Sequence, residues 1–261
     1  MALTPFLLAW YRADEFLRPA RSAATGGSLS REEGATMSTT AIVTFASEAG
    51  QAKGHLARPG KGVPGIIVLQ EWWGLVPHIR DVTGRFAALG YLALAPDLYH
   101  GKSTLEAAEA EHLMKGLDWG RAAKEIAGAV KYLREVEGAT RIGVTGFCMG
   151  GALTVIAAAQ PGVDAYVAFY GFPPAGAAPL EKIMAPGLIF FGEREEYFSV
   201  PDAQAFAEAQ RKRGCELEVI VYPGAGHAFF NNTRPEAYRE DASNYAWRRT
   251  LEHFGRHLRL G

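Results

Sequence analysis

The stretch that decides the fold is RIGVTGFCMGGALTVIAAAQ, residues 141–160. RIGVTG predicts a short buried strand, and MGGALTVIAAAQ predicts a helix that begins directly after it. Between them, Gly146 and Gly150 flank Cys148 with the G-x-nucleophile-x-G spacing of a nucleophile elbow. Glycines suit this sharp turn because side chains would clash where the backbones approach each other.

The predicted helix begins where its positive dipole end faces Cys148. This placement favours a thiolate and later an oxyanion, and it leaves the Met149 amide free to donate a hydrogen bond. The alternative is a buried cysteine in a glycine-rich turn of the dinucleotide-binding type. That turn would carry G-x-G-x-x-G near the first strand of a sheet, whereas this motif follows several strand–helix units.

Strand-like and helix-like stretches alternate from residue 41 to residue 258. The predicted strands are 41–47, 51–59, 65–70, 91–96, 141–146, 163–171, 187–193 and 215–224. The predicted helices are 77–90, 104–115, 119–138, 149–160, 201–214 and 235–258. The first two strands are expected to pair antiparallel at one edge. The alternation predicts an α/β fold with a mostly parallel central sheet and helices on both faces.

A single domain is expected over residues 37–261, preceded by a flexible extension over residues 1–36. The segment ALTPFLLAW is apolar, but its arginines follow it, whereas a secretory signal carries its positive charge first. Met37 is an alternative start, because strand-like sequence begins just after it. An export or organelle signal is the other interpretation of residues 1–36.

Composition narrows the function classes. The chain has 261 residues, 27 basic and 28 acidic side chains, and no basic block, so nucleic acid is not an expected partner. No apolar run reaches the roughly 20 residues that a membrane span needs. The two cysteines, Cys148 and Cys215, do not indicate a disulfide framework, so a reducing, cytoplasmic location is expected. Cys215 is interpreted as a half-buried thiol at the start of a strand.

A thiol nucleophile needs a base, which His227 is placed to supply. It stands in YPGAGHAFFNN, a glycine-rich loop after the last predicted strand, and the chain order in this architecture is nucleophile, acid, histidine. His253 and His257 are expected on the polar side of the last helix. The remaining histidines lie in the early hairpin, in helices or in a loop: His55, His78, His100 and His112.

The orienting acid is expected in GEREEYFSVPDAQ, after the strand over residues 187–193. Glu195 is the preferred residue, and the neighbouring Glu196 is the alternative. Asp202 better suits a helix cap. The structural interpretation of this segment is a solvated, charged loop that also contains Glu193 and Arg194.

With these residues placed, the sequence resembles the dienelactone hydrolase family, whose members have the α/β-hydrolase fold. The matching stretches are GIIVLQEWWGL, ALAPDLYHG, GVTGFCMGG, FGEREEYFSVP and GAGHAFFN. They extend over nearly the whole chain after residue 41. A cysteine in the elbow is unusual among α/β-hydrolases, which makes the combination specific.

The resemblance implies further roles. Glu71 would hold the resting thiol and help to deprotonate it, and the Trp72 amide would complete an oxyanion hole with the Met149 amide. Arg234 and Tyr99 are candidates for binding a substrate carboxylate. The sequence departs from the family in having Glu195 where an aspartate is more usual, in a longer loop after it, and in a more distant Arg234.

The expected reaction is the opening of an enol-lactone or a related activated ester through a thioester on Cys148. No metal or cofactor is expected, because the chain has no metalloprotease motif, no paired cysteines and no phosphate-binding loop. The expected partner is a small-molecule substrate, and the chain is expected to be a monomer or a weak homodimer. The alternatives are a general short-chain ester or thioester hydrolase, a thiol redox protein, and a non-catalytic ligand-binding relic.

Overall fold

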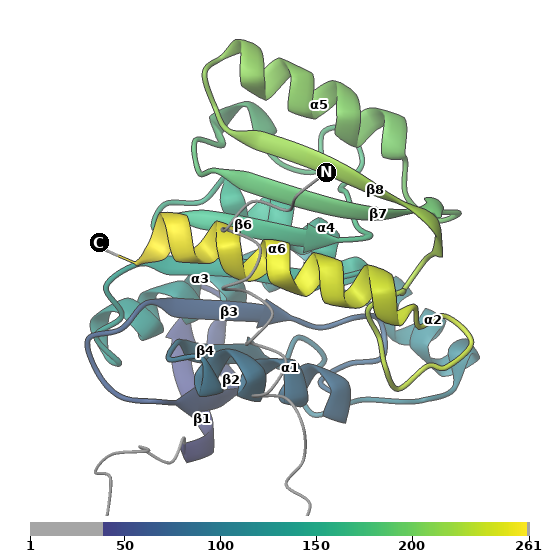
Figure 1. Ribbon diagram of the computed structural model, residues 1–261. Helices are drawn as coiled ribbons and strands as arrows, with labels where there is room; N and C mark the ends of the chain where they lie inside the picture. The colour runs from purple at the N-terminus through teal and green to yellow at the C-terminus, as the bar shows by residue number, and fades with distance from the viewer. Residues whose placement is uncertain (1–38, 260–261) are drawn as a thin grey trace, which may run out of the picture. The chain divides into compact units, whose positions relative to one another are not determined.

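The computed structural model describes residues 39–259, which contain one eight-stranded sheet and the helices that cover it (Figure 1). The strands are β1 (Thr39–Ser47), β2 (Gly50–Arg58), β3 (Gly65–Leu69), β4 (Leu92–Pro96), β5 (Ile142–Phe147), β6 (Ala165–Phe169), β7 (Gly187–Arg194) and β8 (Leu217–Gly226). The α-helices are α1 (Pro77–Ala88), α2 (Ala107–Lys115), α3 (Trp119–Glu135), α4 (Met149–Ala158), α5 (Val200–Lys212) and α6 (Glu240–Leu258). A short 3-10 helix, Leu180–Lys182, precedes β7. The extension and alternative start predicted for residues 1–37 lie outside the described residues.

The strand order is β1-β2-β4-β3-β5-β6-β7-β8. β1 pairs antiparallel with β2, and β2 pairs antiparallel with β4, while all later neighbours are parallel. The predicted fold class and the predicted antiparallel edge pair are therefore confirmed. Because β3 to β8 are parallel, their carboxyl ends lie at one edge of the sheet, which is where ligands bind in such folds.

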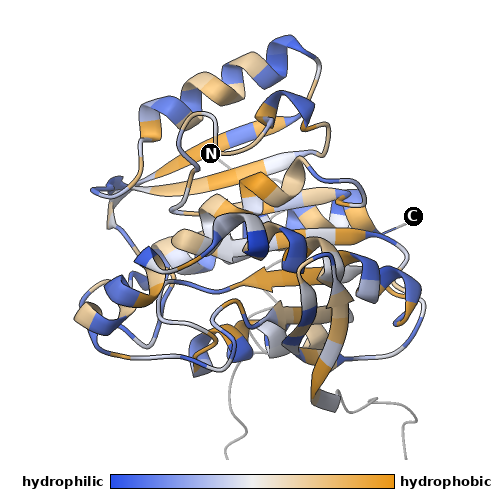
Figure 2. Ribbon diagram, turned by 180° about the vertical axis from the view of Figure 1, so that it is seen from behind, coloured by the Kyte–Doolittle hydropathy of each residue, from blue (hydrophilic) through white to orange (hydrophobic). Residues whose placement is uncertain are grey.

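Both faces of the sheet are covered. Ile66 and Val68 of β3 belong to the core on the side of α1 and α6, while Ile67 and Leu69 belong to the core on the side of α3 and α4. Figure 1 shows α1 and α6 in front of the sheet and α3 behind it, and Figure 2 shows the apolar colouring of the central strands. This double covering explains why β3 to β6 are continuous buried runs rather than alternating ones. Within residues 39–259, no helix has the length and hydropathy to cross a bilayer.

The last helix begins later than predicted. Residues 235–239 lie outside the helix, and residues 235–237 form a turn. The Tyr238 amide donates to the Arg234 carbonyl at 2.9 Å, and the Arg239 amide donates to the Phe229 carbonyl at 3.0 Å. The second bond ties this segment to the loop after β8. Tertiary contacts therefore override the helical preference of PEAYRE, and α6 starts at Glu240.

Three local predictions are wrong. The cap of α5 is Ser199, which accepts from the Asp202 amide, so Asp202 lies inside the first turn. Cys215 is buried rather than half-buried, since its thiol lies against the Ile183 carbonyl. His253 is not on a polar helix face: it is 7% exposed, because the sheet edge and the segment before β7 cover it. His257, predicted on the same polar face, is half-buried.

Candidate active site

Cys148 occupies a strained turn between β5 and α4. Its φ of 56° and ψ of −119° lie in a region that a residue with a side chain rarely adopts. The Cys148 amide donates to the Phe169 carbonyl of β6 at 3.0 Å, and the Cys148 carbonyl accepts from the Ala152 amide at 3.1 Å. Such a conformation costs about 1–3 kcal/mol and persists only where surrounding contacts fix it.

Glycines allow the backbones around this turn to approach each other. A Cβ on Gly150 would lie 2.5 Å from the Gln70 carbonyl oxygen, and one on Gly146 would lie 2.3 Å from the Gly150 oxygen. A Cβ on Gly171 would lie 2.2 Å from the Cys148 oxygen. The first turn of α4 therefore sits directly against the end of β3, which brings the Met149 amide and the Trp72 amide to the same place.

The groups around the Cys148 thiol shift its pKa in opposite directions. Burial raises the pKa of the thiol well above its usual value, and the nearby Glu71 carboxylate raises it further. Hydrogen bonds from the Met149 and Trp72 amides act in the opposite direction, and the Glu195 charge adds to the rise. The net effect of these groups is a raised pKa for a thiol that lies beside two backbone amides.

Glu71 follows β3 and is 1% exposed. One carboxylate oxygen accepts from the Tyr170 hydroxyl at 3.2 Å, and the other accepts from the Asn231 side-chain amide at 2.6 Å. Burial raises the pKa of Glu71, while the Asn231 hydrogen bond and the nearby His227 oppose the rise. A carboxyl group in this setting can exchange a proton with a neighbouring thiol at modest cost.

His227 directly follows β8, and its Nδ1 lies 2.9 Å from each carboxylate oxygen of Glu195. The Glu195 side chain is 0% exposed, and one of its oxygens also accepts from the backbone amides of Tyr197 and Phe198. Glu196, the alternative acid, is exposed. The neighbouring carboxylates therefore differ sharply: one is enclosed against the imidazole and the other faces solvent.

Tyr170 connects the two halves of the site. Its hydroxyl bonds Glu71, and its ring packs edge-on against the His227 ring with centroids 5.0 Å apart. Among the hydrogen bonds of residues 39–259, those of the His227 ring go to Glu195 and none joins it to the Cys148 sulfur. The structure thus gathers these groups at the carboxyl ends of the parallel strands, with the thiol turned toward the amides.

Arg234 and Tyr99 lie in different surroundings. The Arg234 guanidinium stacks over the Trp73 ring at 4.5 Å and pairs with Glu236 at 2.7 Å, so its position is fixed from two sides. Tyr99 is buried, and its hydroxyl lies 3.4 Å from the Met149 sulfur. Tyr99 and Lys102 both line a cavity of about 330 Å³.

Tyr170 and Asn231 are site residues that the sequence did not reveal. Tyr170 is the residue after β6, and Asn231 lies in the same GHAFFNN segment as His227. Their position near the ends of predicted strands could have indicated that they lie near the site. However, only their contacts with Glu71 distinguish them from ordinary polar loop residues.

The fold and site define a hydrolase of the α/β-hydrolase fold. The sheet is mostly parallel, a strained elbow follows β5, and an imidazole bound to a carboxylate follows β8. The model of the dienelactone hydrolase family matches residues 52–258. The chain belongs to the dienelactone hydrolase family and is an ester or lactone hydrolase of that family.

Individual relatives match the chain over nearly their full length. "Protein usf" of Aquifex pyrophilus is 34% identical over 227 residues, covering 83% of this chain and 98% of that protein. The "Probable 2-oxo-3-(5-oxofuran-2-ylidene)propanoate lactonase" of Bradyrhizobium sp. is 30% identical over 222 residues, covering 78% of this chain and 89% of that protein. The crystal structure of the "Putative Dienelactone Hydrolase" of Klebsiella pneumoniae is similar with a TM-score of 0.73 at 27% identity, covering 85% of this chain and 100% of that one.

The close approach of α4 to β3 predicts a pair of opposite glycine effects. Gly150→Ala should lower the free energy of unfolding by about 1–3 kcal/mol, because the new methyl group meets backbone that cannot move aside. Gly84→Ala in α1 has open space around it and should raise stability by about 0.5–1 kcal/mol. Urea denaturation of both variants measures this, and equal stabilities would contradict the interpretation of the turn.

Proposed function

We propose that this protein opens an enol-lactone or a related activated ester, with Cys148 as the nucleophile and a thioester as the intermediate. The observation that carries the proposal is the strained Cys148, whose thiol lies at the Met149 and Trp72 amides beside the buried Glu71. The substrate class named for the Bradyrhizobium relative, an unsaturated oxofuran bearing a carboxylate, supports the choice of an enol-lactone.

The first step requires the thiol to leave the two amides. A substrate carbonyl that enters this position displaces the sulfur, which turns toward the substrate as its proton passes to Glu71. The thiolate then attacks the carbonyl carbon, and the carbonyl oxygen becomes an oxyanion held by the Trp72 and Met149 amides. One such donor is typically worth about 3–4 kcal/mol of barrier.

The second step opens the ring. The tetrahedral intermediate expels either the thiolate or the ring oxygen, whichever is the better leaving group. A simple alkoxide would lose this competition, whereas an enolate is stabilised by delocalisation and leaves with a proton returned from Glu71. The chemistry of a thiol nucleophile therefore favours enol-lactones and activated esters over peptides.

The third step releases the product. His227, oriented through Nδ1 by Glu195, accepts a proton from water at Nε2, and the hydroxide attacks the thioester carbonyl. The oxyanion forms again at the two amides, the carbon–sulfur bond breaks, and the proton held by His227 passes to the thiolate. The net change is the addition of one water across the ester bond. Arg234, fixed over Trp73, is the group assigned to a substrate carboxylate.

The nucleophile is tested with the two cysteines of the chain. Cys148→Ala should lower kcat/KM for an enol-lactone by at least about 10³-fold, because the covalent step is lost. Cys215→Ala, which changes the only other cysteine in the chain, a buried one, should keep the rate. Mass spectrometry of the wild type during turnover should detect an acyl adduct on Cys148. Full activity in Cys148→Ala would overturn the proposal. If simple aryl esters are hydrolysed faster than enol-lactones, the proposed enol-lactone substrate class is wrong.

The orienting acid is tested with adjacent residues. Glu195→Gln should lower kcat by about 10²–10⁴-fold, because His227 would lose the carboxylate that fixes its tautomer. Glu196→Gln changes the same functional group one residue away, at an exposed position, and should leave kcat unchanged. Steady-state kinetics of both variants test which carboxylate orients His227. An equal loss of kcat in both variants would contradict the assignment of Glu195.

The role of Glu71 is tested by removing its charge while keeping its shape. In Glu71→Gln, one cause of the raised thiol pKa disappears, so alkylation of Cys148 by iodoacetamide should reach half its maximal rate at a lower pH than in the wild type. Lactone hydrolysis should nevertheless slow by about 10²-fold or more, because the proton acceptor is gone. A variant with an unchanged alkylation profile and unchanged turnover would show that Glu71 only supports the fold.

A further inference from the structure

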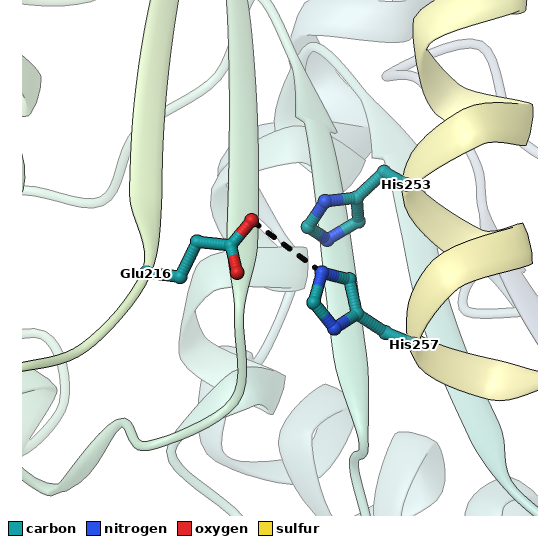
Figure 3. Close-up of side chains that lie close together, drawn as sticks. All are labelled: Glu216, His253 and His257. Carbon is teal, nitrogen blue, oxygen red and sulfur yellow. Dashed lines mark ion pairs between the residues drawn. The ribbon is translucent and has the colours of Figure 1, made fainter.

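Three side chains with metal-binding donors converge far from Cys148. Glu216 lies just before β8, and His253 and His257 lie one turn apart near the end of α6. Figure 3 shows both imidazole rings and the Glu216 carboxylate directed toward one another. β8 begins one residue after Glu216, so this cluster lies at the amino ends of the parallel strands, whereas Cys148 lies at their carboxyl ends.

The distances suit a shared ion. One donor atom from each of the three residues lies within 4.8 Å of the other two, and His257 Nε2 lies 3.5 Å from a Glu216 oxygen. Donors that share a tetrahedral Zn²⁺ at about 2.1 Å lie roughly 3.4 Å apart, so only a small inward movement is needed. The Glu216 side chain is 53% exposed and free to make it.

The two histidines are prepared for this role in different ways. His257 Nε2 is fully enclosed and makes no hydrogen bond, although a Glu216 oxygen lies 3.5 Å away. His253 is buried, and its Nε2 lies 3.2 Å from the Pro186 carbonyl. Carbonyl contacts of this kind orient metal-binding imidazoles. An ion bound at Nδ1 of His253 would leave the contact between Nε2 and the Pro186 carbonyl in place, whereas an ion bound at Nε2 would take the place of that carbonyl.

Arg256 also pairs with the Glu216 carboxylate, but this ion pair is weak. Arg256 Nη1 lies 3.2 Å from the same Glu216 oxygen, but the Arg256 side chain is 68% exposed. Exposed ion pairs contribute about 0–1 kcal/mol, so Arg256 can be displaced by a divalent ion.

We propose that Glu216, His253 and His257 bind one divalent cation of the late first-row type, such as Zn²⁺. Two imidazoles and one carboxylate are donors that these ions accept, with water in a fourth position. The ion would join the end of α6 to the segment that enters β8. Because the cluster lies at the other edge of the sheet from Cys148, the ion stabilises the fold and takes no part in hydrolysis.

The test uses the full chain without a histidine tag and measures Zn²⁺ binding by isothermal titration calorimetry and by thermal unfolding. One ion per chain should bind, and a 100-fold excess over Kd should raise the unfolding midpoint by about 5–10 °C. His257→Gln and Glu216→Gln, both at less enclosed positions than His253, should each weaken binding at least about tenfold. His112→Gln, which changes an exposed histidine elsewhere, should bind as the wild type does.

A second arm separates this cluster from the catalytic thiol. Cys148→Ser should retain the full Zn²⁺ affinity. Absence of binding, loss of binding in Cys148→Ser, or unchanged affinity in His257→Gln would each overturn the proposal. Co²⁺ supplies an independent readout, since four-coordinate binding to this donor set produces visible absorption that His257→Gln should abolish.

Discussion

The site depends on the left-handed backbone of Cys148. No side chain favours this conformation, so it persists because β5, β6 and the first turn of α4 fix the residue from both sides. The same turn aims the start of α4 at the sulfur and presses Gly150 against the end of β3. The positions of the two backbone amides therefore follow from one local constraint, and the amides need no side chains to hold them.

The buried charge of Glu71 is the second organising feature. A carboxylate at 1% exposure is costly unless its oxygens are hydrogen-bonded, and here one partner follows β6 and the other follows β8. Three strand ends are thereby tied to one acidic group. Burial raises the pKa of this carboxyl, and burial together with the Glu71 charge raises the pKa of the Cys148 thiol.

Much of this arrangement could be predicted from the sequence, because periodicity and glycine spacing report on backbone geometry. The elbow around Cys148, the loop position of His227 and the parallel sheet all depend on local patterns. The sequence favours Glu195 over Glu196, but it could not predict that only the Glu195 side chain is enclosed, since enclosure depends on how the loop folds back on β8. His253 was misplaced for a related reason: helical periodicity gives the relative directions of side chains, but the covering of that face by the segment before β7 involves residues distant in sequence.

The enclosed Glu195 has a consequence for how such sites diverge. Its carboxylate accepts from two amides of its own loop as well as from the imidazole, so the acid and residues 196–198 form a self-supporting unit. Because the loop itself holds the carboxylate, insertions on either side of residues 195–198 need not move it. A longer acidic side chain can then reach the imidazole from a shifted backbone. The position of the Glu195 carboxylate is thus set by its own loop as well as by the imidazole of His227.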